Sequence, residues 1–373
     1  MSTSSPTVSQ GLAGIIAGDS AICSVEQDKL IYRGYDIDDL ADNATFEEVA
    51  HLLLVGHKPS AAEAKAFDEQ LKAARALPQD VTELVTRIAK APYMHPMDVV
   101  RTAVSYLGHY DKDCQDNSAE AELRKSIRLT AQIATIIGHM QNAIDGKAVV
   151  KPDNSLGHAA NLLYMMRGEK PTKEEEKIID VSLILYAEHD FNASTFTGRV
   201  IAGTLADLHG AVTGAIAALK GPLHGGANEA AMDMLKEIGT AGNVEPFMKK
   251  AFAEKRKVMG FGHRVYKHGD HRASILHGLG RAYADKKGKE AQKWFEIGEK
   301  VQKIMSDEKG IFPNVDFPCG MTYYVMGIPV PQYTPIFVAA RITGWAAHIM
   351  EQHADKKLIR PLSNYTGPMG KKW

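Results

Sequence analysis

The sequence has few cysteines and no excess charge of either sign, and each absence argues against a class of protein. Only three cysteines occur among its 373 residues. None of them lies in a CxxC pair, so neither a disulfide framework nor a zinc ribbon is indicated. The 44 basic and 45 acidic side chains give a formal net charge of −1. Proteins that bind nucleic acids usually carry a strong basic excess, which this chain lacks.

Targeting and membrane signals are also missing from the sequence. The N-terminal segment MSTSSPTVSQ contains neither the basic region nor the apolar region of a secretory signal. No uncharged apolar stretch reaches the roughly 18 residues of a membrane span. We therefore expect a soluble, cytoplasmic protein whose cysteines are reduced.

Helical periodicity is the main feature that the sequence does contain. Hydrophobic residues make up 45% of the chain and charged residues 24%, a balance that allows a sizeable core. Short apolar runs around a polar turn predict a small β-hairpin at 21–32. Apolar spacing and end signals then predict helices at 46–56, 60–76, 80–90, 96–108, 118–145, 227–238 and 331–354. Because strands and helices do not alternate, the predicted fold class is mainly α.

Two stretches differ from the rest in composition and indicate how the chain is divided. Residues 192–220 are crowded with Ala, Gly, Ser and Thr. Helices with such small side chains can lie in a tightly packed core or in a subunit interface, and both remain open. Residues 243–309 are rich in Lys and Glu, within a more polar insertion. The prediction is a large helical domain of 1–222 and 324–373 and a small domain of 223–323.

Two glycine-containing segments near predicted helix starts carry histidines. GPLHGGANE (221–229) places His224 just before a helix, where a neutral imidazole can donate an N–H to a developing oxyanion. VMGFGHRVYKHGDHR (258–272) places Gly260 and Gly262 beside His263, close to several basic residues. The second segment is a plausible anion site.

A third segment, FPNVDFPCG (312–320), holds an acid between prolines and a glycine. Asp316 has apolar neighbours there, and such a carboxylate can be tuned to act as a general base. Taken singly, each of these residues also has an ordinary explanation. His224 can cap its neighbouring helix, and Asp316 can be an N-cap.

Two other chemistries can be read from the 258–272 segment. Gly260 and Gly262 alone would suggest a nucleotide loop and hence a dehydrogenase. A metal site could be built from the histidines at 263, 268, 271 and 277. No acid or cysteine completes a known ligand spacing there, so we expect no metal.

Further basic residues indicate what the site binds. HDFNAST (189–195) places His189 before a predicted helix start, and Arg341 and Arg360 lie in and after the last long helix. Arginines that converge on carboxylates form bidentate hydrogen bonds, which would suit a di-acid substrate. These residues alone indicate an acid–base enzyme that acts on an anion.

Taken together, the segments resemble the citrate synthase family. HDFNAST, GPLHGGANE, GFGHRVYK, NVDFPCG and the RPLSNYTGP tail occur in the family's order and approximate spacing. LIYRGYDIDDLA and FEEVAHLLLVG resemble the short bacterial and archaeal members, including the 2-methylcitrate synthases. The ordered set is very specific and covers nearly the whole chain. The resemblance implies a mostly helical homodimer in which a large and a mobile small domain enclose the active site.

The resemblance also implies a reaction. Asp316 resembles the base that removes a proton from the acyl-CoA methyl group. His224 resembles the residue that hydrogen-bonds the enol or enolate oxygen, and His263 the one that polarises the oxo-acid carbonyl and protonates the alkoxide. The family condenses acetyl-CoA with oxaloacetate, a step of the tricarboxylic acid cycle, and hydrolyses the thioester to citrate and CoA. The acyl-CoA is a substrate, and no cofactor is needed.

Binding residues follow from the same resemblance. His189, Arg272 and Arg341 match positions that bind the oxo-acid carboxylates, and Arg360 matches an arginine supplied by the partner subunit. His271 stands where many relatives have proline. The implied CoA site comprises Val258, Met259, Gly260, Phe261, Gly262 and Lys267.

One alternative function uses the same chemistry, and another belongs to a different class of protein. A 2-methylcitrate synthase, or a bifunctional enzyme, would use propionyl-CoA instead. One extra methylene changes specificity by only about 1–3 kcal/mol. A non-catalytic relative kept for binding or assembly is the alternative of another class, and the presence of all three catalytic matches argues against it.

Overall fold

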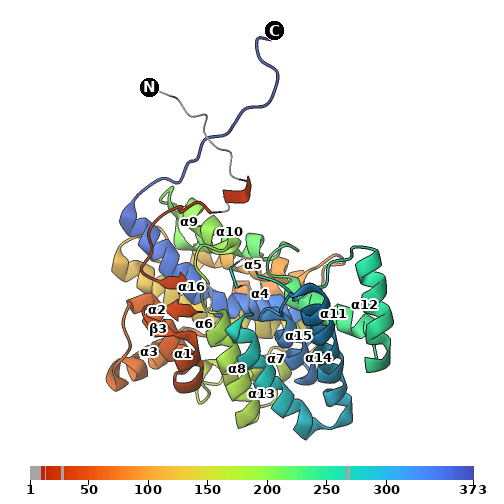
Figure 1. Ribbon diagram of the computed structural model, residues 1–373. Coiled ribbons are helices and arrows are strands. Elements are labelled where there is room, and N and C mark those ends of the chain that lie inside the picture. The colour runs from red at the N-terminus through yellow and green to blue at the C-terminus, as the bar shows by residue number, and fades with distance from the viewer. Residues whose placement is uncertain (1–9, 13, 27–28, 264, 267–268) are drawn as a thin grey trace.

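The computed structural model describes residues 10–12, 14–26, 29–263, 265–266 and 269–373, and this part of the chain is mainly helical (Figure 1). The α-helices are α1 (Ile37–Asn43), α2 (Phe46–Val55), α3 (Ala61–Ala74), α4 (Gln79–Ile88), α5 (Pro96–Leu107), α6 (Ala119–Ile144), α7 (His158–Arg167), α8 (Lys173–Tyr186), α9 (Ala193–Ala202), α10 (Leu208–Leu219), α11 (Ala227–Ile238), α12 (Val244–Ala253), α13 (His271–Lys287), α14 (Lys289–Lys309), α15 (Asp316–Val325) and α16 (Tyr333–Asp355). Short 3-10 helices are η1 (Gln10–Leu12), η2 (Gly108–Tyr110), η3 (Ala241–Asn243) and η4 (Val330–Gln332). The predicted mainly α fold is confirmed. Among the described helices, none combines the length and apolar character needed to cross a bilayer.

The predicted hairpin near the N-terminus is part of a three-stranded antiparallel sheet. Its strands are β1 (Cys23–Val25), β2 (Leu30–Tyr32) and β3 (Tyr35–Asp36), in the order β1-β2-β3. Arg33 and Gly34, with φ of 50° and 91°, form the two-residue turn before β3, as a tight hairpin requires. The hydroxyl of buried Tyr32 donates to the carbonyl oxygen of Glu188 at 2.9 Å. The sheet therefore supports the segment that follows α8.

Helix limits follow the capping signals in the sequence. Thr45 caps α2 through a capping box with Glu48, and Gly56 ends the helix with φ of 99°. The predicted helix at 227–238 has the bounds of α11. These ends are local features, so the sequence alone defines them.

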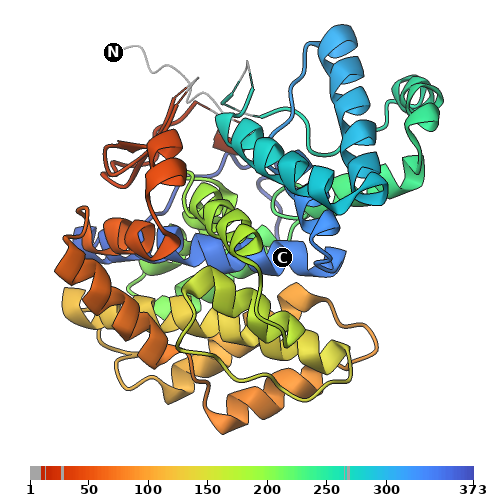
Figure 2. The same cartoon turned by 90° about the horizontal axis from the view of Figure 1, so that it is seen from below.

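The core is organised around two long helices. α6 packs against α16, α3, α4, α5 and α7, and α16 also contacts α8, α9 and α10. Figure 2 shows α16, in blue, crossing the middle of the molecule. The small residues of 192–220 form α9 and α10, which pack closely against each other. A Cβ added at Gly214 of α10 would overlap the side chain of Ile201 of α9, so the absence of a side chain there lets the two helices pack closely.

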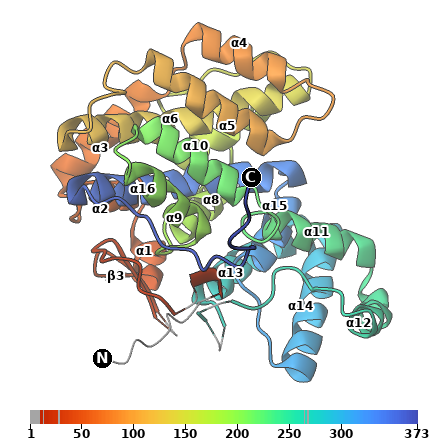
Figure 3. The ribbon, with the colours of Figure 1, turned by 90° about the horizontal axis from the view of Figure 1, so that it is seen from above.

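A second group of helices lies to one side of this core. α11, α12, α13, α14 and α15 gather there, as Figure 3 shows, and α13 also packs against α8. The group falls almost wholly within the predicted small domain of 223–323. Its limits and its mobility remain predictions.

Candidate active site

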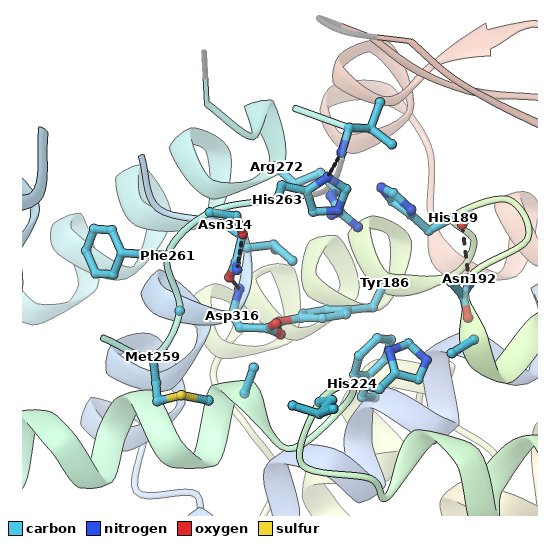
Figure 4. Close-up of a pocket in the computed structure, with 18 of the residues that line it drawn as sticks. Tyr186, His189, Asn192, His224, Met259, Phe261, His263, Arg272, Asn314 and Asp316 are labelled. Atoms are coloured by element: carbon cyan, nitrogen blue, oxygen red, sulfur yellow. Dashed lines mark hydrogen bonds between the residues drawn. The ribbon is translucent and has the colours of Figure 1, made fainter. Parts of the chain in front are cut away.

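A cavity of about 480 Å³ lies between the two helix groups (Figure 4). Its wall is built from α8, α9 and α16, the start of α15, the connection between α10 and α11, and the chain before α13. Predicted site residues that line it are His189, His224, Met259, Gly260, Phe261, Gly262, His263, Arg272, Asp316 and Arg341. The fold therefore brings together residues that are far apart in the sequence.

Asp316 is the first residue of α15, but its side chain does not cap the helix. The N-cap residue is Val315, which has no side-chain cap, and Asn314 Oδ1 just before it accepts from the Asp316 backbone N–H at 3.1 Å. The Asp316 carboxylate instead accepts a hydrogen bond from the Tyr186 hydroxyl, with 2.7 Å between Oη and Oδ1. Burial raises the pKa of Asp316 to about 6, while the Tyr186 hydrogen bond and the Arg272 charge act in the opposite direction. At neutral pH the carboxylate is ionised and still basic enough to accept a proton.

His224 is held by a serine from the start of α9. Its Nε2 lies 2.8 Å from Ser194 Oγ and 3.3 Å from the Ser194 backbone nitrogen. Since a backbone N–H can only donate, we assign the lone pair to Nε2 and the proton to Nδ1. Burial, with a smaller effect of Arg341, lowers the pKa of His224 to about 4. The ring is therefore neutral and has a donor left for a ligand.

The turn that carries His224 depends on close backbone packing. A Cβ added at Gly225 would lie 2.5 Å from the Leu219 carbonyl oxygen, so any larger residue would push the turn away from α10. Gly226 occupies the N-cap position of α11, where no side chain caps the helix. His224 therefore does not cap the neighbouring helix α11, and the alternative that the sequence left open is wrong.

His263 is oriented by its own chain. Its Nδ1 accepts from the backbone N–H groups of Val265 and Tyr266, at 3.1 and 3.2 Å. A neutral ring with these partners carries its proton on Nε2. The ring stacks on Tyr266 with 4.4 Å between centroids and lies 5.0 Å from the His189 ring.

The glycines before His263 bring its segment against the one that carries Asp316. Gly262 N donates to Phe312 O, and Asn314 N donates to Gly260 O, both at 2.9 Å. A Cβ on Gly260, whose φ is 82°, would lie 2.8 Å from Phe317 Cβ. Within the described residues, this loop follows helix α12 and has no strand before it. A strand–turn–helix nucleotide loop is therefore absent there, and the dehydrogenase alternative loses its only support.

Two buried arginines give the cavity a positive character, and a neutral histidine adds a hydrogen-bonding group. Arg272 donates to both carboxylate oxygens of Asp270, at 3.0 and 2.8 Å, and Arg341 Nε donates to Tyr186 O at 2.7 Å. His189 Nε2 lies 3.1 Å from the Tyr266 hydroxyl. Burial and then the nearby Arg272 charge hold the pKa of His189 well below its usual value. The site therefore suits an anion with more than one carboxylate.

Among the predicted site residues that the structure describes, Val258 and Arg360 do not line the cavity. Arg360 is exposed on the C-terminal tail, which leaves the body of the molecule in Figure 1. Val258 is buried with 7% exposure, and its side chain packs into the core beside the cavity. Lys267 lies outside the described residues.

Of the histidines considered as metal ligands, those that the structure describes belong to no common ligand group. His271 begins α13 directly after the N-cap Asp270, so histidine is accommodated where many relatives have proline. Its Nδ1 lies 3.7 Å from Asp38 Oδ2, and His277 Nε2 lies 3.5 Å from Glu299 Oε1. His268 lies outside the described residues. Those described do not form a shared ligand set.

Sequence reasoning missed the residues that orient these side chains. Asn192, Ser194, Asp270 and Asn314 lie inside the motifs and could have been suspected from their positions alone. Tyr186 lies three residues before HDFNAST, and no sequence pattern marked it. Its role depends on the approach of α8 to α15.

This helical fold and its cavity define an acid–base enzyme for an anionic substrate. The family model described as "Citrate synthase, C-terminal domain" matches residues 11–362. The chain belongs to the citrate synthase family and is an acyltransferase.

Relatives of both named activities are similar to the chain. It is 42% identical over 362 residues to citrate synthase 2 of Bacillus subtilis, covering 97% of this chain and 96% of the relative. It is 45% identical over 366 residues to the 2-methylcitrate synthase of Mycobacterium tuberculosis, covering 97% and 91%.

Solved structures agree with the fold. The citrate synthase of Pyrobaculum aerophilum matches with a TM-score of 0.91 and 38% identity, covering 97% of this chain and 93% of the other. A ternary complex of the Thermoplasma acidophilum citrate synthase with carboxymethyl coenzyme A and oxaloacetate matches with a TM-score of 0.93 and 31% identity, covering 99% and 98%.

Proposed function

We propose that this chain condenses acetyl-CoA with oxaloacetate and hydrolyses the resulting thioester to citrate and CoA. The observation that carries the proposal is the meeting of Asp316, His224 and His263 at one cavity, each held by specific partners. No metal or further cofactor has a part in this reaction.

Asp316 and His224 act together in the first step. Asp316 removes a proton from the acyl-CoA methyl group, while Nδ1–H of His224 donates to the thioester oxygen as negative charge develops there. A thioester α-proton is weakly acidic, so the base needs this stabilisation. A positioned base typically contributes about 10²–10⁴-fold in rate, and one oxyanion donor about 10²–10³-fold.

His263 and the basic residues act on the oxo acid. His189, Arg272 and Arg341 bind its carboxylates, and Nε2–H of His263 polarises its carbonyl and protonates the alkoxide. Holding both substrates in one cavity offsets much of the entropy cost of a bimolecular step. The CoA portion lies along 259–262, which line the cavity. Lys267, outside the described residues, is assigned to CoA by the family resemblance alone.

We further propose a homodimer in which Arg360 of one subunit completes the site of the other. The exposed tail supports this, because it carries large apolar residues that one chain leaves uncovered. Leu362 is 87% exposed and Met369 is 82% exposed. Closure of the 223–323 domain over the bound oxo acid would assemble the site before condensation.

The second candidate function is that of a 2-methylcitrate synthase or a bifunctional enzyme. It is supported by the 45% identity to the Mycobacterium tuberculosis relative and by 40% identity to a Bacillus subtilis citrate/2-methylcitrate synthase. Both reactions would use the same catalytic residues. A difference of one methylene is small enough for one site to accept both acyl groups.

The direct test is kcat/KM for acetyl-CoA and for propionyl-CoA, each with oxaloacetate, followed by release of the free thiol. We expect turnover with both and the higher value with acetyl-CoA. A propionyl-CoA preference above about tenfold would replace the first proposal with the second. If neither substrate releases thiol, the non-catalytic alternative is restored.

A further inference from the structure

Tyr186 makes a contact that the proposed reaction does not yet use. It is the last residue of α8, it is 2% exposed, and its hydroxyl donates to Asp316 Oδ1 at 2.7 Å. Figure 4 shows the phenol ring crossing the cavity wall with its oxygen beside the carboxylate. A buried tyrosine hydroxyl needs a partner, and here that partner is the proposed base.

The position of this tyrosine is fixed from several sides. Its ring packs on Phe337, with 4.4 Å between centroids. Its carbonyl oxygen accepts from Arg341 Nε at 2.7 Å, and the preceding carbonyl, of Leu185, accepts from Arg272 at 3.4 Å. The end of α8 therefore holds both buried arginines by its backbone and the carboxylate by a side chain.

The hydrogen bond has only one direction at physiological pH. Burial raises the pKa of the Tyr186 hydroxyl well above its usual value, and the Asp316 charge raises it further. Tyr186 therefore remains protonated and donates, while Asp316 accepts. Asp316 Oδ1 therefore accepts the hydrogen bond from Tyr186, and Oδ2 is the carboxylate oxygen that Tyr186 does not contact.

We propose that Tyr186 is a positioning residue that holds Asp316 Oδ1 so that Oδ2 takes the proton from the acyl-CoA. In this step the α-carbon C–H bond breaks and the proton forms a bond to Oδ2. The electron pair moves into the enolate, whose oxygen is held by His224. Tyr186 keeps its proton throughout. The proposal rests on the assignment of Asp316 as the base.

Other charged groups also face Asp316 and must be considered with Tyr186. Arg272 and Arg341 favour its ionised form, and Asp270 disfavours it. Cys319, one turn along α15, is buried beside both Asp316 and Tyr186. Removal of the Tyr186 hydroxyl leaves these charged groups in place, but it also removes a hydrogen bond with Cys319. The Tyr323 hydroxyl makes a hydrogen bond with Cys319 as well, so a variant at Tyr323 controls for that loss.

The test is the pH profile of kcat/KM for Tyr186→Phe. Loss of a donor to the anion raises the pKa of Asp316, so the acid limb should move to higher pH by roughly one to two units. We expect kcat to fall roughly tenfold at neutral pH and to recover partly at higher pH. The KM for oxaloacetate should stay unchanged. The isotope effect with methyl-deuterated acetyl-CoA should rise, because proton removal becomes slower.

Tyr323→Phe is the matched control. Tyr323 is also buried, and its hydroxyl bonds Ser182 of the same helix α8 without touching Asp316. The control should lose stability comparable to Tyr186→Phe and retain the wild-type acid limb. A second variant carries 3-fluorotyrosine at position 186, which is nearly the same size and is a stronger donor. It should move the acid limb to lower pH.

The outcomes separate this proposal from the one on which it rests. If Asp316→Ala is inactive but both Tyr186 variants keep the wild-type acid limb, the positioning role is overturned and the proposed function stands. If Asp316→Ala keeps near-normal turnover, the base assignment itself fails. If Tyr186→Phe does not fold, the 3-fluorotyrosine variant decides. A shift of its acid limb to lower pH supports the positioning role, and an unchanged acid limb overturns it.

Discussion

Single residues in this site have protonation states set by their neighbours. Burial gives Asp316 a pKa of about 6 and His224 a pKa of about 4. If Asp316 is the base, as we propose, it must be ionised, so we expect kcat/KM to fall about tenfold for each pH unit below about 6. His224 stays neutral in that range and adds no second inflection until about pH 4. Initial rates between pH 4.5 and 8 measure this, and a flat profile down to pH 5 would contradict it.

The Asp316 assignment also predicts a separation of binding from chemistry. Asp316→Ala should lower kcat by at least about 10²-fold because the proton acceptor is removed. Binding of oxaloacetate should survive, since Arg272 and Arg341 remain. Calorimetric titration of the variant with oxaloacetate measures the second quantity. Turnover close to that of the wild type would refute the role of Asp316 as base.

At the scale of elements, the sequence predicts helix ends, which depend on neighbouring residues, but not the contacts between distant segments. The ends of α2 follow from Thr45, Glu48 and Gly56, which act within a few residues. The pairing of 260–262 with 312–314 joins segments about 50 residues apart through two backbone hydrogen bonds. No periodicity or spacing carries that information, because the pairing depends on how α13 and α14, which lie between the segments, are packed. The motifs could therefore suggest His263 and Asp316 but not their proximity.

This pairing gives a prediction for Gly260→Ala. Its φ of 82° and the 2.8 Å approach to Phe317 Cβ both oppose a side chain. We expect a loss of about 1–3 kcal/mol in the free energy of unfolding. We also expect kcat to fall about 10²-fold, because His263 shifts relative to Asp316. Urea unfolding and steady-state kinetics measure the two effects.

Gly310→Ala is the control that separates backbone strain at a positive φ from displacement of the catalytic residues. Gly310 ends α14 with φ of 61° and has no atom within 4 Å of an added Cβ. This variant should lose about 1–2 kcal/mol of stability and keep its kcat. Equal losses of kcat in the two glycine variants would mean that the 260–262 pairing does not position the site.

At the scale of the whole molecule, the arginines show where sequence reasoning stops. Arg272 and Arg341 are separated by α14 and α15, yet both line the cavity because α13 and α16 pack near the end of α8. Convergence of this kind is a property of the fold. Arg360 stays outside the cavity of its own chain, on a tail whose apolar residues are exposed. The family resemblance assigned it to the partner's site, a role that composition and residue spacing alone do not indicate.

Mixing two inactive variants tests that assignment directly. If Arg360 acts on the partner's site, each active site needs Asp316 from one subunit and Arg360 from the other. A mixed dimer of Asp316→Ala and Arg360→Ala subunits then has one intact site and one doubly defective site. Random reassociation makes half of the dimers mixed, so about a quarter of the wild-type activity should return. If Arg360 serves its own subunit, every site in the mixture is defective and no activity returns.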